Sequence, residues 1–332
     1  MNKTLTEELS YKLNKTDIAQ NRYKKPENSK LLIANNKKII KFKNLYSELP
    51  NKSVIVLNKS KLQDVRIKTS KLNTKGKVEI FILKKITENT CECLLKYKGT
   101  KKVGSYIETE LFKFKIIKKN NLSFEIETNL SIDKVIFNFG KTPLPPYIND
   151  KESKYKYYRT EFEDKGFSVA TSTAGLHFDK KMIEHLENNG VIVKYINLDI
   201  GLGTFKPIET EYIENYKIHE ENYSVSKKEF SDLIKLKNKG YKIISVGTTV
   251  LRTLETVALT NVYKGKTNLY IKPGFKFKVV DLLITNFHAP RSTLLSIVLT
   301  IYGKKWKELY TYAQRSKLKF LSFGDAVLFE IK

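Results

Sequence analysis

The stretch Tyr241-Lys-Ile-Ile-Ser-Val246, which runs directly into Gly247-Thr248-Thr249, decides the fold of this chain. Its short apolar run predicts a strand, and the glycine with two threonines predicts a turn into a helix that continues through Leu254. Upstream, Val191-Ile-Val-Lys-Tyr-Ile-Asn-Leu198 predicts another strand of the same kind. Strands separated by helices are typical of an α/β protein.

Helix signals precede both of these strands. Asp179 is a good N-cap for a helix that reaches Asn189, and Gly190 provides a left-handed stop. Ser226 caps a further helix, which Gly240 ends. The repeated order predicts a mostly parallel sheet with flanking helices, in which active groups gather at the carboxyl ends of the strands.

The pattern changes between residues 65 and 147. Runs such as Lys77-Val-Glu-Ile-Phe-Ile-Leu83 alternate polar and apolar residues, which predicts antiparallel strands with one wet face. Pro143-Leu-Pro-Pro-Tyr147 then breaks regular structure. The apolar run Ser53-Val-Ile-Val-Leu57 predicts a strand of the α/β sheet. We therefore predict a discontinuous α/β domain of residues 1–64 and 148–332, with a small antiparallel β-barrel-like domain and its linker, residues 65–147, inserted into it.

The composition is that of a globular protein. The chain has 332 residues, of which 41% are hydrophobic and 11% aromatic, enough for two domains. No apolar stretch approaches the roughly 20 residues of a membrane helix. The first residues form no apolar signal segment, and the two cysteines, Cys91 and Cys93, are too close together for an ordinary disulfide framework. We expect a cytoplasmic protein without a membrane anchor.

The formal net charge of +26 predicts attraction to polyanions, of which nucleic acid is the usual one. Lysine accounts for nearly all of this charge, since arginine occurs only six times. The same bias is expected from AT-rich coding, so the charge alone does not specify RNA.

Two glycine loops are candidate binding sites. Gly201-Leu-Gly203-Thr204-Phe205 follows a predicted strand, and Gly247-Thr248-Thr249 joins a strand to a helix N-terminus, whose free N–H groups hold anions well. Taken alone, a Gly-x-Gly of this kind is better explained as a tight turn without a ligand, and neither loop matches a P-loop or a dinucleotide fingerprint. Arg252, one helical turn further on, is a candidate for bidentate anion binding. Its alternative is a salt bridge with Glu255.

Three of the four histidines lie in predicted loops: His177, His219 and His288. Each is a candidate for acid–base chemistry or polar recognition, and for each a structural role is about as plausible. Their spacing lacks the short-range pairing of zinc ligands, so we expect no metal.

Several motifs, and the order in which they occur along the chain, resemble the S-adenosylmethionine:tRNA ribosyltransferase-isomerase family of queuosine biosynthesis. The longest runs from Gly274 to Leu295 and contains Thr-Asn286-Phe-His288-Ala-Pro. Shorter and less specific segments match upstream, so that the resemblance covers most of the chain. The other motifs are Ser172-Thr-Ala-Gly-Leu-His-Phe178, Gly201-Leu-Gly-Thr-Phe-Lys-Pro207, His219-Glu-Glu221, Val246-Gly-Thr-Thr249, Arg252-Thr-Leu-Glu255 and Phe323-Gly-Asp-Ala326.

The resemblance implies transfer of the ribosyl part of S-adenosylmethionine to a 7-aminomethyl-7-deazaguanine at the tRNA wobble position. The ribosyl group isomerises to give epoxyqueuosine, and adenine and methionine are released. S-adenosylmethionine is thus a consumed substrate, and no cofactor is implied. The partner is tRNA, bound through its anticodon region, and we expect a monomer.

The same resemblance suggests roles for individual residues. His177, His219 or Glu221 would supply acid–base function, and Arg252 with the Gly247-Thr248-Thr249 turn would hold an anionic group. The other expected substrate-binding residues are Phe178 and Phe205, which would face the sulfonium or a base, Asn286 and His288, which would read the nucleobase edge, and Gly201, Gly203 and Thr204.

The chain departs from the family pattern at Asn58-Lys-Ser-Lys-Leu62, where the family has Asn-Asp-Ser/Thr-Arg-Val. Lys59 reverses a charge and Lys61 replaces an arginine. A diverged, catalytically weakened RNA-binding relative is therefore the alternative function. An ordinary methyltransferase is a third hypothesis, which its product, S-adenosylhomocysteine, would reveal.

Overall fold

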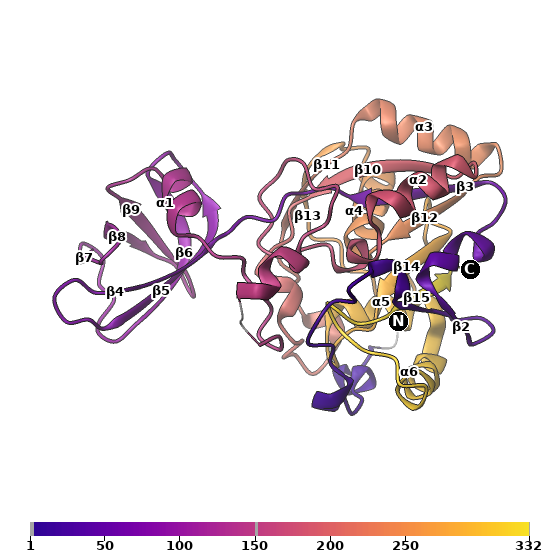
Figure 1. The fold of residues 1–332 in the computed structure, drawn as a ribbon, viewed down its shortest axis with the longest axis horizontal. Coiled ribbons are helices and arrows are strands. Elements are labelled where there is room, and N and C mark those ends of the chain that lie inside the picture. Colours follow the sequence, from indigo (N-terminus) through magenta and orange to yellow (C-terminus); the bar gives the residue numbers. More distant parts are fainter. Residues whose placement is uncertain (1–2, 150–151, 332) are drawn as a thin grey trace. The chain divides into compact units, whose positions relative to one another are not determined.

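The computed structural model describes residues 3–149 and 152–331, apart from the side chains of Thr204 and Phe205 (Figure 1). The chain divides into two compact units. Unit 1 comprises Met1–Lys61 and Pro145–Lys332, and unit 2 comprises Leu62–Leu144. The sequence placed the inserted domain at residues 65–147.

Unit 1 contains a nine-stranded sheet within the described residues, in the order β13-β11-β10-β3-β12-β14-β15-β1-β2. Its centre, β10-β3-β12-β14, is parallel as predicted. The pairs β14–β15, β1–β2, β10–β11 and β11–β13 are antiparallel, so the sheet is mixed and the expectation of a mostly parallel sheet was wrong. The strands are β1 (Lys30–Ile33), β2 (Lys38–Lys41), β3 (Ser53–Asn58), β10 (Ile192–Leu198), β11 (Glu221–Ser224), β12 (Lys242–Val246), β13 (Lys264–Thr267), β14 (Leu282–Asn286) and β15 (Ala326–Glu330).

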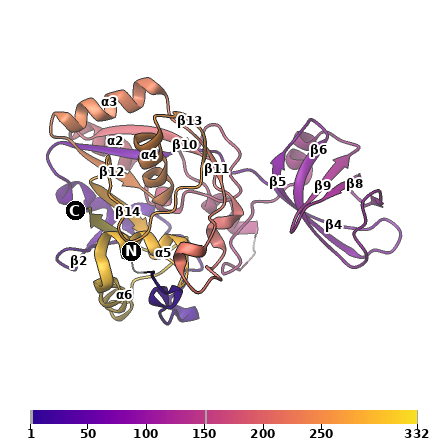
Figure 2. The ribbon, with the colours of Figure 1, turned by 180° about the vertical axis from the view of Figure 1, so that it is seen from behind.

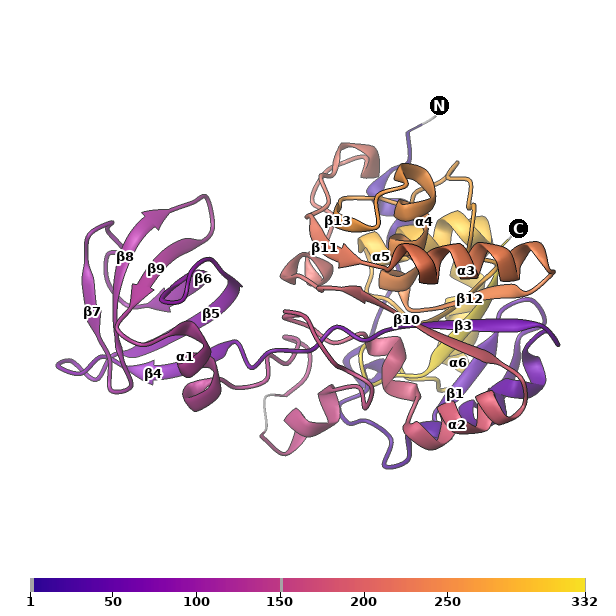
Figure 3. The same cartoon turned by 90° about the horizontal axis from the view of Figure 1, so that it is seen from above.

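Strand β3 shows how the sheet separates two hydrophobic cores. Successive strand side chains point to opposite faces, so Val54 and Val56 pack into one core while Ile55 and Leu57 pack into the other. Residues of α3, α4, α5 and α6 complete the first core, and residues of α2 the second; Figure 3 shows α3, α4 and α5 across the sheet from α2. The helices are α2 (Lys180–Asn188), α3 (Lys227–Asn238), α4 (Thr248–Thr260), α5 (Thr293–Tyr302) and α6 (Trp306–Arg315).

The helix boundaries follow the local sequence signals. The Asp179 side chain accepts a hydrogen bond from the Met182 N–H at 2.8 Å, and Gly190 after α2 has a φ of +82°. Ser226 forms a capping box with Glu229 at the start of α3. These caps confirm the predicted starts of α2 and α3.

Unit 2 is an antiparallel sheet in the order β4-β5-β6-β9-β8-β7, accompanied by α1 (Figure 1). Figure 2 shows β4, β5, β6, β8 and β9 from behind. Alternate residues of β5, such as Val78, Ile80 and Ile82, are buried, as the alternating pattern predicts. Register shifts interrupt β5–β6 and β8–β9, and such bulges curl a sheet. The elements are β4 (Arg66–Ser70), β5 (Lys77–Lys85), β6 (Thr90–Tyr97), β7 (Tyr106–Glu108), β8 (Lys113–Lys119), β9 (Phe124–Thr128) and α1 (Ile132–Phe139).

Short 3₁₀ helices connect these elements, and no helix in the described ranges is both long and apolar enough to cross a membrane. The 3₁₀ helices are Thr6–Leu9, Lys15–Asp17, Pro26–Asn28, Phe42–Glu48, Glu152–Tyr158, Thr173–His177, Leu202–Phe205, Ile213–Asn215 and Gly303–Lys305.

Candidate active site

A cavity of about 270 Å³ lies in unit 1 at the carboxyl ends of the central strands. Gly247 follows β12, Asn286 ends β14, and Ile200 lies two residues beyond β10; all three line the cavity. Parallel strands end at the same edge of a sheet, which brings these positions together. We call this space the substrate cavity. Its place is the one that the alternation of strands and helices predicted.

The N-terminus of α4 forms one wall of the substrate cavity through Gly247, Thr248 and Thr249. Gly247 has a φ of +89°, a conformation that favours glycine. The Thr249 hydroxyl is buried and has no hydrogen-bond partner among the described residues. Free N–H groups of a first helical turn, with an unpartnered hydroxyl beside them, suit an anionic group.

Asn286 lines the cavity and has a buried acceptor without a partner among the described residues. Its Nδ2 donates to the Leu321 carbonyl at 3.3 Å and lies 3.3 Å from His177 Nε2. Because a carbonyl can only accept, the nitrogen of the amide must lie on this side. The Oδ1 atom is buried and has no partner among the described residues.

The tautomer of His177 follows from these contacts. Since Asn286 Nδ2 donates, His177 Nε2 must accept, and the proton is on Nδ1. The Ser29 hydroxyl, 2.7 Å from Nδ1, donates to the Pro26 carbonyl at 2.8 Å and is therefore free to accept from Nδ1–H. Both ends of the chain of hydrogen bonds thus require the same tautomer.

His177 is also held neutral. Burial, with a smaller contribution from the positive charge of Arg22, lowers the pKa of His177 to about 3. Its ring stacks on Phe42 with centroids 4.9 Å apart. A neutral ring with both nitrogens engaged is better suited to orienting Asn286 than to acid–base catalysis, which works best with a pKa near the working pH.

His288 lines the substrate cavity beside Asn286. Its Nε2 lies 3.0 Å from the Thr285 hydroxyl, and its backbone carbonyl accepts from the Tyr11 hydroxyl at 2.6 Å. Burial lowers the pKa of His288 to about 3, so this ring is also neutral near pH 7. The structure therefore brings Asn286, His288 and the Gly247 turn into one site.

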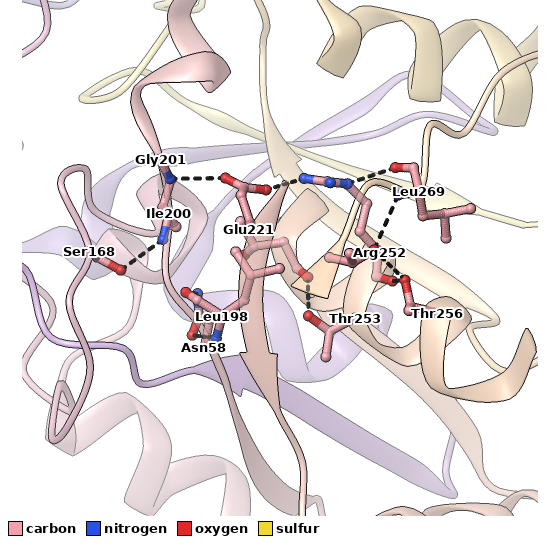
Figure 4. A network of polar contacts seen from close by, with 12 residues as sticks. Asn58, Ser168, Leu198, Ile200, Gly201, Glu221, Arg252, Thr253, Thr256 and Leu269 are labelled. Atoms are coloured by element: carbon pink, nitrogen blue, oxygen red, sulfur yellow. Dashed lines mark hydrogen bonds and ion pairs between the residues drawn. The ribbon is translucent and has the colours of Figure 1, made fainter. Parts of the chain in front are cut away.

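Arg252 and Glu221, by contrast, form a buried ion pair (Figure 4). Arg252 also donates from Nε to the Leu269 carbonyl at 2.9 Å, and the second Glu221 oxygen accepts from the Gly201 N–H at 3.0 Å. Neither side chain lines the substrate cavity. The expected anion site of Arg252 with the Gly247 turn is thus not assembled, because the guanidinium faces Glu221 instead. Glu255, the alternative partner, accepts from three backbone N–H groups of residues 278–280.

The remaining candidates lie outside the substrate cavity. His219 is exposed and packs so close to Gly203 that a Cβ there would be 2.4 Å from its ring. Phe178 is fully buried in the core, with its ring 5.1 Å from that of Phe42, so it does not face a substrate. The side chains of Thr204 and Phe205 fall outside the described part of the structure.

Sequence reasoning missed Ser29 and Leu321 as parts of this site. Nothing in the sequence around Ser29 links it to His177. Leu321 lines the cavity with a φ of +67°, a conformation that is rare outside glycine. No sequence signal marks that conformation, and the Leu321 N–H donates to the carbonyl of Phe287, which is distant in the sequence.

The altered segment after β3 also lies away from the cavity lining. The Lys59 ammonium pairs with Asp164 at 3.3 Å, and both side chains are substantially exposed. Lys61 holds the loop through backbone hydrogen bonds, including one from its N–H to the Lys165 carbonyl. Within the described ranges, no group of three or more His, Cys, Asp or Glu side chains is arranged to hold a metal.

The fold and the cavity together define an α/β protein with a cavity at the carboxyl edge of its parallel strands. A sequence model of the family described as queuosine biosynthesis protein matches residues 6–329. The chain belongs to this family, which confirms the resemblance seen in its motifs.

Comparison with individual relatives supports the same family. The chain is 36% identical to the S-adenosylmethionine:tRNA ribosyltransferase-isomerase of Halothermothrix orenii, over 97% of this chain and 98% of that protein. It is 37% identical to the protein of the same name from Thermotoga petrophila, with the same coverage. The crystal structure of an S-adenosylmethionine tRNA ribosyltransferase from Thermotoga maritima superimposes with a TM-score of 0.54 at 30% identity, covering 97% of this chain and 99% of that chain.

Proposed function

We propose that this chain transfers and isomerises the ribosyl moiety of S-adenosylmethionine onto 7-aminomethyl-7-deazaguanine in tRNA. The products are epoxyqueuosine in the tRNA, adenine and methionine. Family membership and the relatives that share 36–38% identity support this enzyme class. We further propose a cytoplasmic monomer that acts on the wobble position of the anticodon, consumes S-adenosylmethionine and needs no cofactor.

One observation carries the assignment of the site: two residues that line the substrate cavity each have a buried polar atom that lacks a partner among the described residues. These are Asn286 Oδ1 and Thr249 Oγ1. An unsatisfied buried polar group costs about 1–3 kcal/mol, so a ligand that pairs with both atoms recovers that free energy on binding. Such a site favours a polar, N–H-bearing ligand over a purely apolar one.

The polarity of each atom indicates which part of a substrate it takes. Asn286 Oδ1 can only accept, so it would bind an N–H group of a heterocycle, either the amino group of adenine or the guanine-like edge of the deazaguanine. Thr249 and the first N–H groups of α4 would bind an anion, for which the methionine carboxylate of S-adenosylmethionine is suitable. His177 would act through Asn286 as a positioning residue.

The cavity also meets a general requirement of this chemistry. Proton removal next to a sulfonium and rearrangement of a ribose produce reactive intermediates that must be kept from water. The walls of the substrate cavity include Ile200, Phe287 and Leu294, which present apolar surface around the polar contacts.

The direct test is incubation of the purified chain with S-adenosylmethionine and tRNA that carries the aminomethyl-deazaguanine. We expect adenine and methionine to be released in equal amounts with modified tRNA. S-adenosylhomocysteine as the product would instead identify a methyltransferase. Tight tRNA binding without adenine release would favour the weakened RNA-binding relative.

A matched variant addresses the altered segment after β3. Lys59 pairs with Asp164 away from the cavity lining, so Lys59→Asp should leave the rate of adenine release within about twofold of the parent chain, as surface changes usually do. A large rise in that rate would show that the charge reversal at this position had impaired the enzyme.

A further inference from the structure

A second cavity of unit 1, of about 590 Å³, is strongly basic. Four cationic side chains line it, and no acidic residue does so among those that the structure describes. We call it the basic groove. Its cationic residues are Arg22, Lys24, Lys154 and Lys156, and its aromatic residues are Tyr157 and Phe323.

The cations of the basic groove are available to a ligand to different degrees. Arg22 donates from its guanidinium to the Leu176 carbonyl, which fixes its direction, while its buried Nε has no hydrogen-bond partner among the described residues. Lys24 and Lys156 are exposed. The Lys156 ammonium lies 4.9 Å from the centroid of the Tyr157 ring, which is itself 43% exposed.

The basic groove adjoins the substrate cavity. A small pocket between them shares Ser322 with the substrate cavity and shares Arg22 and Phe323 with the basic groove. His177 lines the same small pocket. A polymer with one residue in the substrate cavity would therefore meet the basic groove with a neighbouring residue.

We propose that the basic groove binds the phosphate backbone of the tRNA strand next to the nucleotide held in the substrate cavity. This inference rests on the proposed function. Phosphates repeat at every nucleotide and can be matched by several cations, and the aromatic ring of Tyr157 offers a surface on which a base can stack.

The methionine carboxylate of S-adenosylmethionine is the other anion that could enter. It carries a single charge, and the N-terminus of α4 already offers it N–H donors inside the substrate cavity. Lys154 is buried and already has an interaction, but the three other cations still exceed what one carboxylate needs, so the tRNA backbone is the better match.

The test is the double substitution Lys24→Gln/Lys156→Gln. Both side chains are exposed, so the fold should be kept. The matched control is Lys227→Gln/Lys228→Gln at the exposed start of α3, which changes the net charge equally. The dissociation constant of tRNA is measured for each protein at several salt concentrations, and that of S-adenosylmethionine at one.

We expect the groove variant to bind tRNA about tenfold or more weakly at 0.15 M salt, with the slope of log K against log salt reduced by about 1.4–1.8, since two phosphate contacts are lost. The control should bind tRNA nearly as the parent chain does. An equal loss in both variants would mean that only the overall field matters and would overturn the proposal, as would weaker S-adenosylmethionine binding with unchanged tRNA binding.

Adenine release by the parent chain separates this inference from the proposed function. If the parent chain releases adenine and the groove variant still binds tRNA normally, the groove proposal fails while the function stands. If the parent chain releases no adenine and tRNA binding still depends on the groove, the function fails while the groove proposal stands.

Discussion

The side-chain nitrogen of Asn286 lies 3.3 Å from Nε2 of His177, a residue 109 positions earlier in the chain. Together with the Leu321 carbonyl, this contact fixes the orientation of the Asn286 amide. It leaves Asn286 Oδ1 as an acceptor without a partner among the described residues, at a residue that lines the substrate cavity, so we expect a substrate to supply the donor.

Asn286→Leu should weaken binding of one substrate about tenfold or more, because it removes the acceptor and leaves His177 without its donor. Loss of a good hydrogen bond of this kind typically costs about 1–3 kcal/mol. Separate dissociation constants for S-adenosylmethionine and for tRNA will show whether adenine or the deazaguanine donates. Unchanged constants for both would remove Asn286 from the binding site.

Asn286→Asp is the matched control, since it keeps an oxygen facing the cavity at nearly the same volume. A carboxylate beside His177 stabilises the protonated ring, so the pKa of His177 should rise above its value of about 3. Titration of the His177 ring proton by NMR measures this shift. A pKa that does not move would contradict the contact between these side chains.

Stability should fall with acid because His177 and His288 are buried in the neutral form. Both have a pKa of about 3 in the folded chain against 6.5 for the free side chain. Between these values the unfolded chain binds more protons, so the contribution is complete above pH 6.5 and is lost as the pH falls toward 3. Together, two such groups can change the unfolding free energy by at most about 2.7 kcal/mol for each pH unit.

Urea unfolding at pH 7, 6 and 5 checks this. His177→Gln and His288→Gln should each flatten the dependence of unfolding free energy on pH. His185→Gln, which changes an exposed ring on α2, is the control and should leave the dependence as it is. Equal slopes in all three variants would exclude burial of neutral histidine as the cause.

Glu221→Gln should destabilise the fold by about 3–5 kcal/mol, because it leaves the buried Arg252 charge without its partner. Replacing both residues, as in Glu221→Gln/Arg252→Met, removes the isolated charge and should recover part of that loss. A double-mutant cycle in urea measures the coupling. Additive losses would show that the two side chains do not interact.

His219→Ala should leave adenine release within about threefold of the parent chain, since the ring is exposed and outside the substrate cavity. Loss of a general acid or base usually costs about 10²–10⁴-fold in rate. A decrease of that size, with unchanged unfolding free energy, would instead show that His219 reaches the substrates in the complex.

Gly247→Ala should cost about 1–3 kcal/mol of stability, because its φ of +89° and ψ of 154° lie in a region that is essentially restricted to glycine. Gly240→Ala is a matched control, since Gly240 has a φ of +85° and no atom would contact its Cβ within 4 Å. Both variants should lose stability, but only Gly247→Ala should weaken S-adenosylmethionine binding. Equal binding in both would remove the α4 N-terminus from the site.

The site residues at the strand ends were predictable because their place depends on the order of strands, turns and helices in the nearby sequence. A strand followed by a glycine turn and a helix placed Gly247 at the carboxyl edge of the sheet, and the same edge holds Asn286 and His288. The mixed sheet was not predictable in the same way, since the direction of β15 beside β14 depends on a pairing between distant segments.

The sequence by itself determined the caps of α2 and α3, the alternating strands of unit 2, the place of the cavity and the family. All of these follow from neighbouring residues or from contiguous motifs. Only the tertiary structure decided that Arg252 pairs with Glu221 and that neutral His177 orients Asn286. Charge pairing and the protonation of a ring depend on burial and on partners far away in the chain. The stretch that runs from Tyr241 into Thr249 contains no information about such partners.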